Sequence, residues 1–263
     1  MDKIDILKRW IAESSRIVAF TGAGVSTESG IKDFRSKDGL YSENWRPNAQ
    51  DSTESGIPDF RSTDGLYSQK FDYPPETIIS HTFYERKPDY FFRFYREKML
   101  PLGFEPNITH RVLAQWEQEG KLSAVVTQNI DGLHQKAGSK RVYELHGSVL
   151  RNYCVRCGKF HSAEFIRDAE GVPKCDCGGI VKPDVVLYEE GLDQATVSKS
   201  IMAIYGADLL IVAGTSLTVY PAAGLIEYYQ GKRLVLINRD ETPYDGRADL
   251  VIHDSLGNVF GKL

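Results

Sequence analysis

Short apolar segments, each ending at a glycine or polar turn, set the fold class of this chain. Arg16–Thr21 (RIVAFT) runs directly into Gly22-Ala23-Gly24, which is how a nucleotide-binding strand–turn–helix unit begins. Similar segments follow at Leu122–Thr127, Asp208–Ala213, Arg233–Asn238 and Asp249–His253, with predicted helices at 2–13, 107–119, 194–205 and 221–230. Apolar strands that alternate with helices predict an α/β fold, a Rossmann-like parallel sheet covered on both faces.

Two segments break this alternation. Residues 70–105 are rich in Tyr, Phe and Pro, and we predict helices near 75–86 and 88–100 that form a helical insertion against the main domain. Residues 151–180 hold every cysteine of the chain and predict a small metal-binding module. The predicted organisation is a main domain of 1–31 with 106–150 and 181–263, an insertion of 32–105 and a module of 151–180.

Charge and hydropathy exclude several classes of protein. The formal net charge of the 263 residues is −4, so no basic excess favours direct binding to nucleic acid. Apolar runs are far shorter than the roughly 18 residues of a membrane helix, and Met1–Trp10 lacks the apolar core of a signal peptide. We therefore expect a soluble cytoplasmic protein without a membrane partner, and no feature demands more than a monomer.

The four cysteines form two close pairs. Cys154-x-x-Cys157 is followed after 17 residues by Cys175-x-Cys177. Disulfides are rare in the cytosol, whereas two thiolate pairs at this spacing suit one tetrahedral zinc ion. Four protein ligands leave no open position, so the pattern predicts a structural rather than a catalytic zinc site.

Polar side chains follow the ends of several predicted strands. In an open α/β sheet, ligands bind at this edge, and glycines there let the backbone approach a pyrophosphate. The candidate residues are Gly22, Ala23, Gly24 and Thr27 after the first strand, Gln128, Asn129 and Asp131 after the second, Gly214, Thr215 and Ser216 after the third, and Asn238 and Asp240 after the fourth. His146, between an apolar run and a glycine, is a candidate general base. Taken singly, each motif also fits a turn or a structural role.

Together, these motifs resemble the sirtuin family of NAD-dependent protein-lysine deacylases, most closely its small bacterial members. The resemblance spans nearly the whole chain. It is carried, in the family's order, by GAGVSTESGI, DFRS-x-DGLY, TQNIDGLH, ELHGS, the cysteine quartet, KPDVVLYEE, AGTSLTVYPAAGL and LVLIN.

The resemblance implies a deacetylase that consumes NAD and releases nicotinamide and O-acetyl-ADP-ribose. It implies His146, Asn129 and Asp131 as catalytic residues, with Asp131 and Ile130 at the nicotinamide carboxamide. Acetyl-lysine proteins would bind as an added strand beside Val185, Val186 and Tyr188. The implied NAD-binding residues are Gly22, Ala23, Gly24, Thr27, Phe34, Arg35, Phe60, Arg61, Gln128, Asn129, Ile130, Asp131, Gly214, Thr215, Ser216, Asn238, Asp240 and Ile252.

In the implied reaction, the acetyl oxygen attacks ribose C1′ as nicotinamide leaves, and His146 takes a proton from a ribose hydroxyl. The zinc ion takes no part in it. Family members that prefer dicarboxylic acyl groups resemble one another in a Tyr-x-x-Arg pair. The matching stretch here is Phe92-Arg93-Phe94-Tyr95, so we expect a small neutral acyl group, chiefly acetyl.

A duplication departs from the family pattern. Ser26–Ser42 and Ser52–Ser68 are identical at 15 of 17 positions, at a spacing of 26 residues. The first copy keeps its distance from Gly22-Ala23-Gly24 but has Lys32 in place of Pro; the second keeps Pro58 and the run into the helices. Either Phe34 and Arg35 or Phe60 and Arg61 then contact NAD, and we favour the first pair.

Three other functions stay open on the sequence alone. The same cleft could transfer ADP-ribose to a protein. The duplicated loop could leave a catalytically impaired protein that only binds NAD or acyl-lysine. A dehydrogenase is the weakest alternative, because no second site suits a hydride acceptor.

Overall fold

The computed structural model describes residues 2–34, 39–41 and 71–263. Its main element is a six-stranded parallel sheet in the order β3-β2-β1-β7-β8-β9. The strands are β1 (Ile17–Thr21), β2 (Leu122–Thr127), β3 (Val142–Glu144), β7 (Leu209–Ala213), β8 (Leu234–Ile237) and β9 (Leu250–Ile252). The predicted Rossmann-like sheet is confirmed. All its strands are parallel, and the strand order reverses at the junction of β1 and β7, with β2 and β3 on one side and β8 and β9 on the other.

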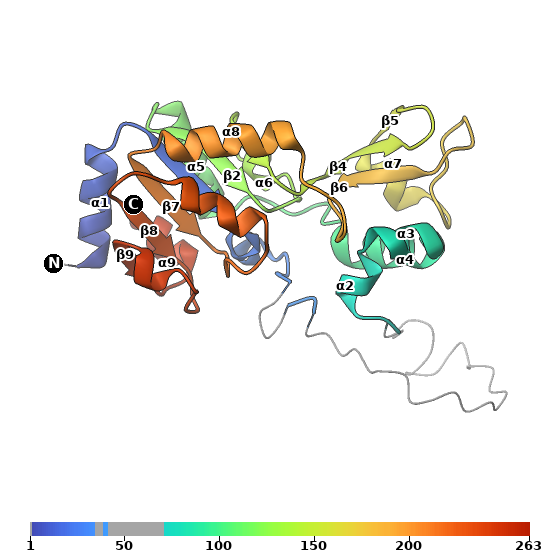
Figure 1. Cartoon of the computed structure of the whole chain (residues 1–263), viewed down its shortest axis with the longest axis horizontal. Coiled ribbons are helices and arrows are strands. Elements are labelled where there is room, and N and C mark those ends of the chain that lie inside the picture. The colour runs from blue at the N-terminus through green and yellow to red at the C-terminus, as the bar shows by residue number, and fades with distance from the viewer. Residues whose placement is uncertain (1, 35–38, 42–70) are drawn as a thin grey trace.

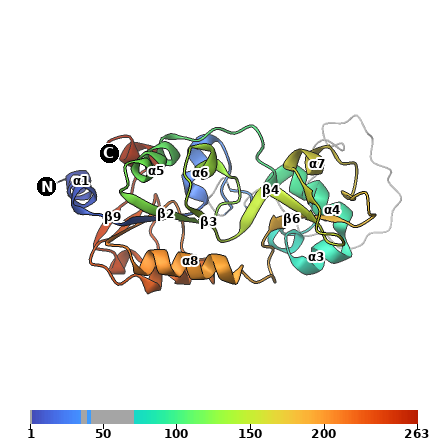
Figure 2. The same cartoon turned by 90° about the horizontal axis from the view of Figure 1, so that it is seen from above.

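Helices cover both faces of this sheet, because its strands are apolar on both sides (Figures 1 and 2). One face packs against α1 (Lys3–Glu13), α5 (Ile108–Gln118) and α9 (Leu256–Phe260). The other packs against α8 (Gln194–Tyr205) and the 3₁₀ helix η5 (Ala222–Tyr228). The short α6 (Leu133–Lys136) follows β2 and contacts α5.

A second lobe lies at the end of the main sheet nearest β3 (Figure 2). Its antiparallel sheet has the order β5-β4-β6, formed by β4 (Gly147–Cys154), β5 (Phe160–His161) and β6 (Val181–Val185). Its helices are α2 (Pro75–Ile78), α3 (His81–Arg86), α4 (Pro88–Phe94), the π-helical η4 (Tyr95–Met99) and α7 (Ala163–Asp168). We predicted that the helical insertion packs against the main domain, but its buried side chains share one core with the cysteine region.

Four predicted helices differ in the structure, one of them 88–100, which is α-helical over α4 and π-helical over η4. The glycine turn after β1 leads into two 3₁₀ turns, η1 (Ala23–Val25) and η2 (Thr27–Ser29), which end at left-handed Gly30. The predicted helix 75–86 divides at Ser80, which caps α3 and bridges to Tyr188. The segment after Pro221 is 3₁₀ rather than α-helical. No helix in the described part of the chain is long and apolar enough to cross a membrane.

Candidate active site

The candidate site begins at the carboxyl ends of β1 and β7, where the strand order reverses. Gly22 donates its N–H to Ala213 O (3.1 Å), and Gly24 donates to Gly214 O (2.8 Å). A Cβ on Gly24 would lie 2.9 Å from Gly214 Cα, so only glycine lets the two loops approach this closely. This junction is where ligands bind in doubly wound folds.

A cavity of about 340 Å³ opens from this junction towards β6 and the second lobe. The predicted residues that line it are Gly22, Ala23, Gly24, Phe34, Gln128, Asn129, Ile130, His146, Val185, Val186, Tyr188, Gly214, Thr215, Ser216, Asn238 and Asp240. Thr27 lines a smaller adjoining cavity, which shares Gly24, Gly214 and Asn238 with the first. Ile252 is different: it lies in the core beneath the sheet and lines neither cavity.

A polar network lies beneath the floor of this cleft. Asn129 Nδ2 donates to Ser26 Oγ (3.1 Å), and Ser26 Oγ donates to Asp131 Oδ2 (2.7 Å). Burial raises the pKa of Asp131, although bonds from Ser26 and from the Leu133 N–H (2.8 Å) partly offset it. Asp131 thus sits behind Asn129 rather than on the cavity wall, held in one orientation.

The geometry of His146 fixes its tautomer. His146 Nδ1 lies 2.9 Å from Gln128 O, and a carbonyl oxygen can only accept, so Nδ1 carries the proton. In the neutral ring, Nε2 is then the basic nitrogen. The backbone is fixed too, because His146 O accepts the Val186 N–H (3.0 Å) and Gly147 has φ 76°. A Cβ on Gly147 would lie only 1.9 Å from Asp184 O.

The segment after β6 forms a tight turn over Leu187–Glu190. Glu190 N–H donates to Leu187 O (3.1 Å), and the Glu190 carboxylate accepts the Leu187 N–H (2.8 Å). Tyr188 N–H is already donated to Ile79 O (3.1 Å), and Tyr188 O accepts the His81 N–H (3.0 Å). The backbone N–H and C=O of Tyr188 are therefore already hydrogen-bonded within the second lobe, and only its side chain remains to contact a peptide.

Several cavity residues were missed by our sequence reasoning. They are Asp33, Tyr41, Ile79, Met99, Leu187, Glu189, Glu190, Leu192, Val219, Tyr220 and Pro221. Leu187, Glu189 and Glu190 belong to the KPDVVLYEE motif, whose residues Val185, Val186 and Tyr188 were predicted to bind peptide, so that motif could have revealed them. Ile79 and Met99 carry no such signal, because they come from helices that only the fold brings to the cleft.

The first copy of the duplicated loop reaches the cleft. Phe34 and Tyr41 both line it, and their rings meet edge to face with centroids 5.6 Å apart. Tyr41 N–H donates to Phe34 O (3.0 Å), and Leu40 N–H donates to Asp33 O (2.8 Å). Arg35, Phe60 and Arg61 lie outside the described residues.

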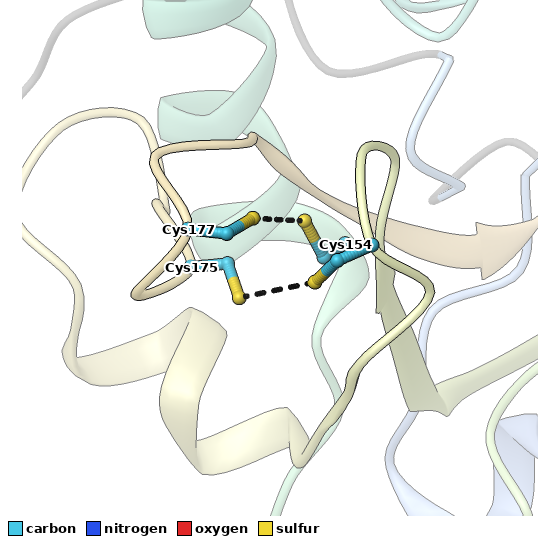
Figure 3. Close-up of side chains that lie close together, drawn as sticks. Cys154, Cys175 and Cys177 are labelled. Atoms are coloured by element: carbon cyan, nitrogen blue, oxygen red, sulfur yellow. Dashed lines mark hydrogen bonds between the residues drawn. The ribbon is translucent and has the colours of Figure 1, made fainter.

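The four cysteines converge as the zinc prediction requires. Their Sγ atoms all lie within 4.8 Å of one another, with Cys154–Cys177 at 3.4 Å and Cys157–Cys175 at 3.7 Å (Figure 3). Zn–S bonds of about 2.3 Å place tetrahedral sulfurs roughly 3.8 Å apart, so the quartet fits a zinc ion closed by four thiolates. A Cβ on Gly179 would lie 2.6 Å from Cys154 Sγ, so this knuckle needs glycine.

Comparisons with known proteins agree with this geometry. The Sir2 family model matches residues 22–53 and 48–221. The NAD-dependent protein deacetylase of Clostridium acetobutylicum is 55% identical over 261 residues, covering 98% of this chain and 97% of that protein. The chain belongs to the Sir2 family. A second relative, the NAD-dependent protein deacetylase of Clostridium perfringens, is 54% identical and covers 100% of this chain and 98% of its own length.

Solved Sir2 structures extend the likeness to the fold. A Sir2 complex with a deacetylated p53 peptide and 3′-O-acetyl ADP ribose has a TM-score of 0.83 at 36% identity, covering 99% of this chain and 97% of its own. A Sir2 complex with a p53 peptide and NAD⁺ has a TM-score of 0.79 at 37% identity, covering 100% and 97%. The two segments of the Sir2 match each contain one copy of the duplicated loop, so the family pattern occurs twice at this point of the chain.

Proposed function

We propose that this sirtuin is an NAD-dependent protein-lysine deacetylase, whose reaction takes place in the cleft between the main sheet and the second lobe. The observation that carries the proposal is the place of His146. Its basic nitrogen is defined by the Gln128 carbonyl, and it lies between the glycine loops of a dinucleotide-binding sheet and the end of β6. The catalytic, NAD-binding and peptide-binding residues are part of this proposal.

The cleft suits NAD as co-substrate. Backbone groups of the two glycine loops can approach its pyrophosphate, and Asn238 and Asp240 offer polar groups to a ribose. Gln128 Nε2 donates to Thr215 Oγ1 (2.9 Å), so these two side chains are oriented before any ligand arrives. When bound, NAD supplies the ribose carbon that receives the acyl oxygen, and nicotinamide is its leaving group.

His146 is the general base in this proposal. A neutral imidazole with its proton on Nδ1 can accept a proton at Nε2 from a ribose hydroxyl and pass it on later. The Gln128 carbonyl then stabilises the imidazolium through the Nδ1–H bond. Asn129, held through Ser26 to Asp131, orients polar groups at the nicotinamide end.

The cleft favours a small neutral acyl group. No Lys or Arg lines it among the described residues, and its carboxylates are Asp33, Glu189, Glu190 and Asp240. Phe92 and Tyr95, at the positions of the Tyr-x-x-Arg pair, are fully buried and outside the cavity wall. A dicarboxylic acyl group would find no cation among these described residues, so acetyl-lysine is the favoured substrate.

The first copy of the loop is proposed to contact NAD. Phe34 already lines the cleft, and Arg35 follows it directly in the chain. Arg35→Ala should raise the KM for NAD by at least tenfold, whereas Arg61→Ala should leave it nearly unchanged. The opposite result would assign the second copy, and no effect from either substitution would exclude both.

We also place the protein in the cytoplasm as a monomer. Four free cysteines placed to hold a metal ion favour a reducing compartment. Sedimentation of the purified protein would test the monomer, and fractionation of source cells would test the location.

The deciding experiment incubates the protein with NAD and an acetyl-lysine peptide, and measures the products by mass spectrometry. We expect deacetylated peptide, nicotinamide and O-acetyl-ADP-ribose in equal amounts. His146→Ala should slow product formation by about 10²- to 10⁴-fold, because general base catalysis is worth that much. Transfer of ADP-ribose to protein without deacetylation, or no turnover by zinc-loaded protein, would refute the proposal.

A further inference from the structure

Two tyrosine hydroxyls meet across the cleft. Tyr41 Oη lies 3.1 Å from Tyr188 Oη, although the residues are 147 positions apart in the chain. Tyr41 comes from the first copy of the duplicated loop, and Tyr188 from the turn that follows β6. Both residues line the cavity, so the contact joins the proposed cofactor loop to the proposed acyl-lysine segment.

The Tyr188 side of this contact is held rigidly. Tyr188 N–H and O are both bonded to the second lobe, at Ile79 O (3.1 Å) and the His81 N–H (3.0 Å). The carboxylate of Glu190 has three partners that hold the same turn. They are the Leu187 N–H (2.8 Å), Lys182 Nζ (3.1 Å) and His81 Nδ1 (2.8 Å). The position of Tyr188 therefore does not depend on the loop.

The turn itself is strained, which shows how strongly its surroundings determine it. Glu189 has φ 75° at the third position of the turn, where such turns usually carry glycine. Its carboxylate accepts the Thr82 N–H (2.8 Å), which helps to hold that conformation. Strain of this kind persists only where neighbouring contacts over-determine the backbone, and it often marks a binding segment.

On the other side of the pair, Tyr41 contacts Phe34, which lines the cofactor end of the cleft. Tyr41 is bonded to Phe34 through the backbone (3.0 Å) and packs on its ring at 5.6 Å. A shift of Tyr41 must therefore move Phe34, which lines the cavity near Gly22–Gly24. The chain of contacts runs from the β6 turn through Tyr188 and Tyr41 to Phe34.

We propose that the Tyr41–Tyr188 hydroxyl pair is a positioning device that couples the binding of NAD to the binding of the acyl-lysine peptide. Because the second lobe fixes Tyr188, a ligand that holds Tyr41 against it, NAD through Phe34 or the peptide at the β6 turn, favours the arrangement that the other ligand requires, and such coupling is reciprocal. The device uses Tyr41 of the first copy and not its counterpart in the second copy, Tyr67. This inference rests on the proposed function, because it names the interaction between the two ligand sites of that reaction.

The test measures the Kd of an acetyl-lysine peptide by calorimetry, without ligand and with saturating ADP-ribose, which occupies the NAD site but cannot react. The ratio of the two Kd values is the coupling. We expect the ratio to fall about threefold to tenfold in Tyr41→Phe, as for the loss of one hydrogen bond. Tyr188→Phe should lower it equally, and the double variant should lower it no further.

Tyr67→Phe is the matched control and should leave the ratio unchanged. Each ratio is internal to one variant, so a uniform loss of affinity or stability cancels. An unchanged ratio in Tyr41→Phe or Tyr188→Phe, additive losses in the double variant, or a loss in Tyr67→Phe would overturn the inference. A wild-type ratio of one would overturn it as well, whereas wild-type protein that binds neither ligand would overturn the proposed function with it.

Discussion

Acidification should destabilise this fold through a buried histidine, His110 of α5. Its side chain is fully buried, and its ring centroid lies 4.8 Å from that of His134, which is buried too. Burial lowers the pKa of His110 from 6.5 to about 4, and the nearby charge of Arg111 lowers it further. At neutral pH the ring is uncharged and accepts the Asn107 N–H at Nδ1 (3.3 Å), which completes the cap of α5.

The sign follows from the direction of this shift. The unfolded chain binds a proton at His110 below about pH 6.5, whereas the folded chain does not until about pH 4. Stability from a neutral His110 is therefore intact above pH 6.5 and is lost as the pH falls towards 4. With these two pKa values the loss at pH 5 is about 2 kcal/mol, a large share of the stability of an ordinary domain.

Urea denaturation at pH 8 and pH 5 would measure this, with His110→Asn as the comparison. Asn keeps an acceptor near the position of Nδ1 but does not titrate. At pH 8 the variant should have a lower free energy of unfolding than the wild type, because the smaller side chain leaves a cavity. At pH 5 this difference between wild type and variant should be smaller by about 2 kcal/mol.

His81→Asn is a control of opposite sign. The pKa of His81 is raised, chiefly by its hydrogen bond to Glu190, so its contribution is present at pH 5 and lost as the pH rises. The deficit of His81→Asn should therefore be larger at pH 5 than at pH 8. A His110→Asn deficit that stays the same at both pH values would refute the reasoning.

Three further outcomes are expected. Removing zinc with a chelator should unfold the second lobe, seen as loss of near-ultraviolet circular dichroism that added zinc restores, because the quartet Cys154–Cys177 closes its core. Asp131→Asn should raise the urea midpoint at pH 7, because burial disfavours the charged carboxylate, while deacetylation falls by 10²-fold or more; a lower midpoint would contradict this. Glu190→Gln should raise the peptide KM about tenfold at unchanged kcat, because the turn at Leu187 loses charge-assisted bonds; a fall in kcat alone would count against it.

The main sheet could be predicted because its signals are local. β2 was predicted with its observed bounds, and β1, β7, β8 and β9 differ only at their ends, since each is a continuous apolar run that stops at a turn. β3 was missed because its three residues, Val142–Glu144, are partly exposed and include a carboxylate. The segment after Pro221 has a helical pattern, but the structure tightens it to a 3₁₀ helix, a distinction that apolar spacing does not encode.

The site divides in the same way. Glycines and polar residues at strand ends were found because the strand that precedes each one is visible in the sequence. The contacts of Glu190 were not predicted, because its partners His81 and Lys182 come from different elements. The Tyr41–Tyr188 contact is also invisible to local patterns: Tyr188 was named as a peptide-binding residue and Tyr41 lies in the duplicated motif, but nothing in the sequence pairs two residues 147 positions apart.

The duplicated loop can be accommodated because of where its ends lie. The strands of the main sheet, as far as the structure describes the chain, all come from segments outside the two copies, which span 26–42 and 52–68. On the N-terminal side of residues 42–70, Phe34 and Tyr41 pack on the core of the second lobe; on the C-terminal side, Phe71 packs on the same core, with its ring 4.8 Å from that of Phe94. Loop-closure entropy rises by only about 0.6 kcal/mol for each doubling of length, so 26 extra residues between two anchored ends cost little. The entropy of loop closure therefore gives no reason for a second copy to destabilise the fold.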